Sequence, residues 1–240
     1  MLLSVIIPVY NGAATVGRCL ESIAHQSVQT PLEVLVAVDG STDGTADILR
    51  THARTHEYIK VLPLAHRGQA AARNEALRHA TGDWVCFLDA DDYWDPDYLK
   101  HILPGLKDGT DVLQTGYKGH PATRKYRLLS AWSKVIRREF LVKHRILFPE
   151  GFHYDDPVWA ARLWQAKPRI TLSDSTGYNY PVNSQSVTAN PKPTEPVRRE
   201  LRNMGLRPWD FGWLRLRLAA HFIKERWLTV DKRQQQTQTI

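Results

Sequence analysis

The first half of the chain alternates between short apolar runs and longer amphipathic segments. Four runs have the length and β-branched content of buried strands: 4–9, 33–38, 59–62 and 84–88. Helices are predicted between them, first from a face formed by Val16, Cys19, Leu20 and Ile23, and then over 45–54 and 69–80. Nearly continuous apolar strands separated by helices are typical of a mostly parallel, Rossmann-like sheet with helices on both faces. The pattern therefore predicts an α/β fold.

The apolar pattern loosens after residue 115, where we predict a mixed α+β half. Its elements are two helices and a strand, near 139–144, 158–165 and 178–182. A linker is indicated by Pro191, Pro193 and Pro196. We therefore predict a domain over 1–190, with halves 1–115 and 116–190, followed over 191–240 by a linker and a C-terminal helical appendage.

The predicted appendage carries an apolar stripe at helical spacing within 209–228. The stripe consists of Trp209, Trp213, Leu216, Ala220, Ile223 and Trp227, flanked by Arg215, Arg217, Lys224 and Arg226. An amphipathic helix with tryptophans and flanking cations is typical of a membrane surface. A helix docked on its own domain gives the same pattern, so both interpretations stay open. Pro208 and Gly212 weaken the start of this helix.

Composition narrows the classes of partner. The 240 residues carry a net charge of +7, which suits a phosphate-bearing ligand, nucleic acid or an anionic membrane surface. Cys19 and Cys86 fall in a predicted helix and a predicted strand, as expected for buried thiols in a reducing cytosol. The sequence starts directly with a strand pattern and contains no run of eighteen apolar residues, so we expect neither a secretory signal nor a membrane span. We expect a cytoplasmic protein.

Ligands of parallel sheets bind beyond the carboxyl ends of the strands, where the topology switches. The polar positions to examine are therefore those that follow the predicted strands: Tyr10-Asn11-Gly12, Asp39-Gly40, His66-Arg67-Gly68 and Asp89-Ala90-Asp91-Asp92. Three carboxylates in four residues repel one another unless a cation compensates them. Mg²⁺ and Mn²⁺ take oxygen ligands and commonly bridge carboxylates to phosphates. The last segment therefore predicts a metal site for a diphosphate, with a solvated or helix-capping loop as the alternative.

Three further groups are candidates for the same site. Asp39 could accept a hydrogen bond from uracil N3–H, or it could simply form a turn with Gly40. Asp155-Asp156 precedes a predicted helix, where the pair could cap the helix or Asp156 could serve as a general base. Arg73-Asn74 and Lys134 are candidates for phosphate or acceptor contacts, or are ordinary solvated residues.

In combination these segments resemble family 2 glycosyltransferases with the GT-A fold. The matching segments, in order, are 4–11, 38–45, 72–74, 87–92, 132–134, 148–156, 178–180 and 186–188. The resemblance covers about residues 1–190. It departs at Val38, where the family often has a first aspartate before Asp39, and at Asp155, where it often has glutamate.

The resemblance implies an inverting transferase that takes a sugar from a nucleoside diphosphate sugar, usually UDP-linked, with Mn²⁺ or Mg²⁺. It implies Asp156 as the catalytic base and Asp89 and Asp91 as contacts to ribose and metal. Its other nucleotide-sugar contacts are Pro8, Val9, Tyr10, Asn11, Asp39, Gly68, Arg73 and Ala90, and its further acceptor or phosphate contacts are Lys134, Asp92 and Asp155. The acceptor would be a saccharide or lipid-linked saccharide in surface polysaccharide synthesis, with 209–228 as a contact to a membrane surface.

Two other classes stay as alternatives. A sugar nucleotidyltransferase shares a parallel sheet and metal carboxylates, but it should carry a glycine-rich basic loop where this chain has Tyr10-Asn11-Gly12-Ala13. A non-catalytic, basic nucleic-acid-binding module would explain the charge, but the cations form no recognisable motif. The dinucleotide and P-loop signatures are absent. We expect no nucleic acid partner.

Overall fold

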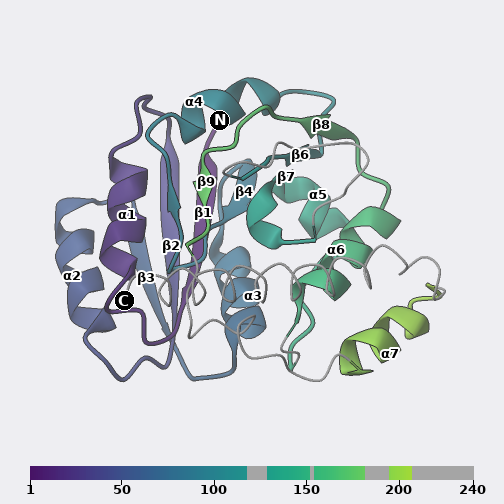
Figure 1. Cartoon of the computed structure of the whole chain (residues 1–240), viewed down its shortest axis with the longest axis horizontal. Helices are drawn as coiled ribbons and strands as arrows, with labels where there is room; N and C mark the ends of the chain where they lie inside the picture. Colours follow the sequence, from purple (N-terminus) through teal and green to yellow (C-terminus); the bar gives the residue numbers. More distant parts are fainter. Residues whose placement is uncertain (118–128, 152–153, 182–194, 207–240) are drawn as a thin grey trace, which may run out of the picture. The chain divides into compact units, whose positions relative to one another are not determined.

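In the part of the chain that the structure describes, a seven-stranded sheet has the order β3-β2-β1-β4-β7-β6-β8 (Figure 1). This computed structural model describes residues 1–117, 129–151, 154–181 and 195–206. The strands are β1 Leu3–Val9, β2 Leu32–Asp39, β3 Ile59–Leu64, β4 Trp84–Phe87, β6 Val112–Gln114, β7 Lys134–Arg137 and β8 Ile170–Leu172. Among these described strands only β7 runs against its neighbours, so the sheet is mostly parallel, as predicted.

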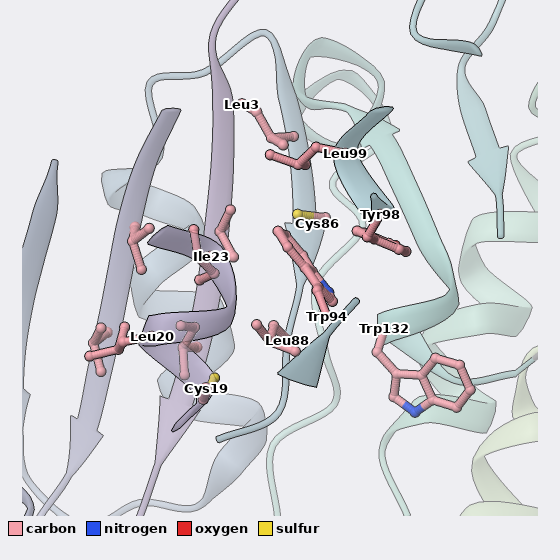
Figure 2. Close-up of a cluster of buried hydrophobic side chains, with 14 of the residues drawn as sticks. Leu3, Cys19, Leu20, Ile23, Cys86, Leu88, Trp94, Tyr98, Leu99 and Trp132 are labelled. Atoms are coloured by element: carbon pink, nitrogen blue, oxygen red, sulfur yellow. The ribbon is translucent and has the colours of Figure 1, made fainter. Parts of the chain in front are cut away.

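Helices cover both faces of the sheet. The helices of this unit are α1 Val16–Ala24, α2 Thr45–Thr55, α3 Gln69–His79, α4 Tyr98–Ile102, α5 Arg138–Lys143 and α6 Asp156–Gln165, with 3₁₀ turns η1 Leu103–Gly105 and η2 Ala131–Ser133. One core joins α1, α2 and α4 to the odd-numbered side chains of β1 (Figure 2). The other joins α3, α5 and α6 to Ile6. Burial on both faces explains why the strands read as continuous apolar runs.

The strand order reverses between β1 and β4, and Pro8 marks the place where these strands separate. Leu88 N donates to Ile6 O, so the even-numbered residues of β1 turn their backbone groups toward β4. The β1–β4 pairing ends at Ile6 and Phe87, whereas β1 continues to pair with β2 as far as Val9. The missing N–H of Pro8 therefore removes no bond from the ladder. This is the kind of switch point where α/β proteins bind ligands.

The predicted elements of the first half are present, with ends that differ by a few residues. Two predictions need correction. The strand predicted near 178–182 is only β9, Tyr178–Asn179, because it pairs with the equally short β5, Tyr93–Trp94. Pro196 lies in the first turn of α7, Glu195–Asn203, and not in a linker. A helix tolerates proline in its first turn because the N–H that is missing there would make no helical bond.

The chain divides into two compact units, 1–183 and 184–240, and α7 belongs to the second. The apolar stripe of 209–228 lies outside the described residues. Among the described helices, none combines the length and apolar character needed to cross a membrane. Cys19 and Cys86 are buried free thiols, which agrees with the sequence.

Candidate active site

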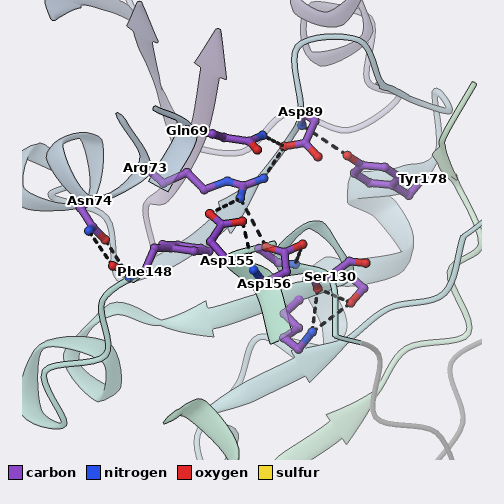
Figure 3. Close-up of polar contacts among 12 residues, drawn as sticks. Gln69, Arg73, Asn74, Asp89, Ser130, Phe148, Asp155, Asp156 and Tyr178 are labelled. Carbon is purple, nitrogen blue, oxygen red and sulfur yellow. Dashed lines mark hydrogen bonds and ion pairs between the residues drawn. The ribbon is translucent and has the colours of Figure 1, made fainter. Parts of the chain in front are cut away.

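The acidic loop 89–92 leaves β4 at the switch point, and its first and last carboxylates are anchored differently. Asp89 keeps 17% of its side chain exposed and accepts a hydrogen bond from Arg73 at 2.7 Å. Asp92 is fully buried and accepts a 2.6 Å bond from the Tyr178 hydroxyl. The same hydroxyl accepts from Asp89 N at 3.3 Å (Figure 3). Tyr178, which lies on β9, therefore fixes the acidic loop from the second half of the unit.

Asp91 lies between these anchors and is partly exposed. The guanidinium of Arg18, on α1, donates to the Asp91 carbonyl at 2.7 Å and lies 4.7 Å from the centre of the Tyr93 ring. These contacts shape the backbone of the loop around Asp91. Burial and the charge of Asp89 together raise the pKa of Asp92 to about 9.

Arg73 binds three aspartates of the site at once (Figure 3). Its guanidinium is 98% buried and donates to Asp89 at 2.7 Å, Asp155 at 3.1 Å and Asp156 at 3.3 Å. One buried cation therefore joins the acidic loop to the start of α6. The guanidinium also lies 5.1 Å from the centre of the Phe148 ring, and the neighbouring Asn74 exchanges two hydrogen bonds with the Phe148 backbone. These contacts fix α3 beneath the site.

Asp155 and Asp156 differ in their contacts at the start of α6. Asp155 caps α6, with its side chain accepting from Asp156 N at 3.0 Å. Asp156 keeps 24% of its side chain exposed and accepts from Ala131 N at 3.4 Å. Burial raises the pKa of Asp156 to about 7, with Arg73 opposing this shift. A partly exposed carboxylate with a pKa near neutrality suits a general base.

The carboxylate of Asp39 is enclosed by the loop that follows β3. It accepts from Arg67 N at 2.7 Å and Gly68 N at 2.9 Å, and His66 Nδ1 lies 3.0 Å from Oδ2. Its side chain is only 4% exposed. A carboxylate offers about four lone pairs, so these two backbone hydrogen bonds leave capacity for a base N–H. Gly68 adopts φ +94°, a conformation that glycine accepts at little cost, and this turn directs its N–H to Asp39.

The exposed surface beside Asp39 is aromatic. Tyr10 is 51% exposed and stacks on His66 with ring centres 4.2 Å apart. Asn11 follows in the left-handed region at φ +49° and accepts from Thr42 N at 2.8 Å. An exposed ring next to an enclosed carboxylate suits a planar base. Pro8 and Val9 lie under this surface as buried residues of β1.

Three predicted contact residues lie deeper than the sequence suggests. Lys134 and Asp92 are fully buried, and Asp155 is 6% exposed. The Lys134 ammonium donates to Ser130 O at 2.7 Å and Ser133 Oγ at 3.1 Å. These positions support the walls of the site and do not favour direct contact with a phosphate or an acceptor.

Tyr178, Gln69, Arg18 and His66 contact the predicted site residues but were not predicted as site residues. Tyr178 stood within a recognised motif, and His66 followed a predicted strand. Gln69 donates to Asp89 at 3.3 Å from the first turn of α3. Nothing in the local sequence singles out Arg18, whose contact depends on how α1 packs against the acidic loop.

The residues present suit an oxygen-preferring cation by their chemistry. Asp89 and Asp91 supply carboxylates from one loop, and neither is fully buried. Within the described ranges, no group of three or more His, Cys, Asp or Glu residues stands ready to hold a metal ion. A Mn²⁺ or Mg²⁺ ion here would therefore take further ligands from water or phosphate, as Mg²⁺ commonly does.

The fold and the site define an α/β protein of the GT-A type, and comparisons with known proteins agree. Residues 4–167 match the model of the family described as glycosyl transferase family 2. The Escherichia coli K12 protein named uncharacterized glycosyltransferase YibD is 30% identical over 217 residues, which cover 78% of this chain and 63% of YibD. This chain belongs to glycosyl transferase family 2.

Two solved structures share the fold. Residues 1–349 of S. aureus TarS, in complex with UDP-GlcNAc, give a TM-score of 0.75 at 27% identity, over 84% of this chain and 65% of that one. The mannosyltransferase PcManGT from Pyrobaculum calidifontis, in complex with GDP-Man and Mn²⁺, gives a TM-score of 0.65 at 25% identity. The match covers 78% of this chain and 59% of the PcManGT chain. The predicted GT-A fold is thereby confirmed. The chain spans 63% of the length of YibD, 65% of TarS residues 1–349 and 59% of the PcManGT chain.

Proposed function

We propose that this chain transfers a sugar, with inversion, from a nucleoside diphosphate sugar to a hydroxyl of a saccharide or lipid-linked saccharide. The observation that carries the proposal is the junction at Arg73, which brings Asp89 of the donor-side loop and Asp156 of the second half to one guanidinium. Family membership supports the reaction class. The TarS complex with UDP-GlcNAc and the PcManGT complex with GDP-Man support a nucleotide-sugar donor.

Uridine is the proposed base. The Tyr10 ring would stack on it, and a remaining lone pair of Asp39 would accept from its N3–H. Cytosine has no hydrogen at N3, so it could not make this bond. Asp89 and Asp91 would hold Mn²⁺ or Mg²⁺ against the diphosphate, as the Mn²⁺ in the PcManGT complex supports. When bound, such an ion neutralises the charge that develops on the leaving diphosphate.

The proposed chemistry is a single displacement. Asp156 takes the proton from the acceptor hydroxyl while the hydroxyl oxygen bonds to the anomeric carbon. The bond from that carbon to the diphosphate oxygen breaks, and the nucleoside diphosphate leaves with the electron pair. An α-linked donor would give a β-linked product. Arg73 and Ala131 N hold the Asp156 carboxylate in place for this step.

The proposed setting is the synthesis of surface polysaccharide, with the protein in the cytoplasm at the inner face of the membrane. The stripe predicted over 209–228 would bring the site to lipid-linked acceptors there. The proposed domain boundary stays near residue 190. These three points rest on the sequence and on the family.

The first test is UDP binding measured by calorimetry with and without Mn²⁺. We expect binding that depends on Mn²⁺ and is lost in Asp91→Ala, because that substitution removes one of the two proposed metal carboxylates. Asp83→Ala is the matched control, since Asp83 is an exposed carboxylate at the opposite end of β4. Binding of GDP but not UDP would overturn the uridine assignment, and absence of binding to either would overturn the proposed function.

The pH dependence of the reaction gives a second test. A base must be unprotonated to accept a proton, and the pKa of Asp156 is raised to about 7. We therefore expect kcat/KM for transfer, or for hydrolysis of the UDP-sugar, to rise with pH through about 7 and to level off above 8. UDP binding measured over the same range separates this effect from donor affinity. A profile that is flat from pH 5 to 8 would contradict Asp156 as the base.

A further inference from the structure

The single positive charge of the Arg73 guanidinium faces three aspartates, which together can carry more negative charge than it can neutralise. Asp89 bonds to Nη2, whereas Asp155 and Asp156 both bond to Nη1. Three carboxylates around one buried cation compete for it, and hydrogen bonds of this charge-assisted kind are strong. A change of charge at one carboxylate must therefore change how firmly Arg73 holds the other two.

Arg73 has little freedom to turn toward one partner. It is 2% exposed, its guanidinium lies against Phe148, and Phe148 stacks face to face on Trp159 with ring centres 4.7 Å apart. Asp155 is held as the cap of α6. The sharing of Arg73 is thus fixed in geometry, and it responds to charge more than to movement.

From this arrangement we propose that Arg73 is a positioning residue that couples occupancy of the donor site to the readiness of the base Asp156. The proposal rests on the function proposed above. When Asp89 takes part in binding a metal and diphosphate, it draws less on Arg73. The guanidinium then holds Asp156 more firmly in its charged form and in place for the acceptor. Donor binding therefore prepares the base before the acceptor reacts.

Among the described residues, the contacts of Asp156 favour Arg73 as the mediator of this coupling. The charged groups that act on it are Arg73 from α3, Asp155 from its own helix, Asp89 from the acidic loop and Lys134 from β7. Only Arg73 among these four makes described hydrogen bonds to both Asp89 and Asp156.

Coupling between sites is reciprocal, so the base must also affect the donor. We expect Asp156→Asn to weaken binding of UDP with Mn²⁺. Arg73 then has one charged partner fewer and binds Asp89 more strongly, so that it competes better with the metal for this carboxylate. A coupling of ordinary size would weaken binding by about fivefold or more. The measurement is calorimetric titration of UDP in the presence of Mn²⁺ at pH 8, where Asp156 of the wild type is charged.

A double-mutant cycle isolates the role of Arg73. Arg73→Lys keeps the positive charge but loses the planar fork that reaches several carboxylates at once. In this background Asp156→Asn should change UDP affinity by less than about twofold. A direct effect of the Asp156 charge on UDP would be the same in wild type and in Arg73→Lys. The difference between the two backgrounds therefore measures the coupling through Arg73. An equal effect of Asp156→Asn in both, or no effect in either, would overturn the coupling, whereas wild type that does not bind UDP overturns the proposed function beneath it.

A measurement on wild type covers the case in which Arg73→Lys does not fold. At pH 7, binding of UDP with Mn²⁺ should release protons as Asp156 becomes more fully charged. The release is obtained from calorimetry in buffers with different ionisation enthalpies. Asp156→Asn should remove part of it, and the remainder reports groups other than Asp156. Proton release that is unchanged in Asp156→Asn would contradict the proposal.

Discussion

Asp156→Asn should reduce the rate of sugar transfer by about 10²–10⁴-fold, the usual contribution of a positioned general base. The substitution keeps the size of the side chain and its bond from Ala131 N, but the amide cannot accept the acceptor's proton. The larger part of the loss should fall on kcat, because the group acts on the reacting hydroxyl, and the weaker donor binding inferred above should add a smaller loss through KM. The measurement is transfer or hydrolysis of the UDP-sugar identified in the binding test.

Asp155→Asn is the matched control for this prediction. Asp155 is the adjacent carboxylate and bonds to the same Arg73 nitrogen, but it is 6% exposed and caps α6. Its substitution should cost stability and at most a modest part of the rate. Equal loss in both variants would show that the pair acts only through Arg73. Full activity in Asp156→Asn would remove Asp156 from the mechanism.

The strands β1, β2 and β4 of the first half were predictable because they are buried along almost their whole length, and α1 was predictable because it is buried on one face. The buried residues of α1 are the four that the periodicity selected, Val16, Cys19, Leu20 and Ile23. Local pattern and tertiary burial agree there. The second half offered no such agreement. β6 and β8 have only three residues each, and β7 has four, so their strand character comes from pairing with neighbours.

The sequence indicated the carboxylates of the candidate site but not the contacts between them. The sequence placed Asp89 and Asp39 after buried strands, and topology brought both to one edge. Nothing in the spacing of Arg73 and Asp156, 83 positions apart, indicates that they share a hydrogen bond. That contact depends on α6 packing beside α3 through Phe148 and Trp159. The depth of Lys134 likewise depends on packing, since its own segment is not a continuous apolar run.

Glu33 is the position where we expect the largest loss of stability. It lies on β2 with 5% of its side chain exposed, far from the carboxyl edge of the sheet. Its Oε1 accepts from Ser4 Oγ at 2.7 Å and Thr81 N at 2.6 Å, and its Oε2 from Lys60 Nζ at 2.9 Å. Glu33→Ala leaves several of these donors unpaired. The free energy of unfolding should fall by about 3–5 kcal/mol, because each buried donor that is left unpaired costs about 1–3 kcal/mol.

The same residue predicts how stability depends on pH. Burial alone would raise the pKa of Glu33, but hydrogen bonds from Thr81, Ser4 and Lys60 outweigh it and lower the pKa from 4.5 to about 2. A carboxyl group whose pKa is lowered by folding stabilises the folded state at any pH above its pKa in the unfolded chain. This contribution disappears as the pH falls from about 4.5 to 2. The difference corresponds to about 3 kcal/mol. Urea unfolding at pH 7 and pH 2 measures it, and Glu33→Ala should lose this part of the dependence.

Lys60→Met separates the buried network from the surface ion pair. The Lys60 side chain is 55% exposed, and exposed pairs contribute about 0–1 kcal/mol. We therefore expect Lys60→Met to cost less than about 1 kcal/mol at pH 7, because Glu33 keeps its bonds to Ser4 and Thr81. A loss as large as that of Glu33→Ala would mean that the ion pair, and not the buried hydrogen bonds, holds β2 to the start of β4. Near-equal stability of wild type and Glu33→Ala would contradict the network itself.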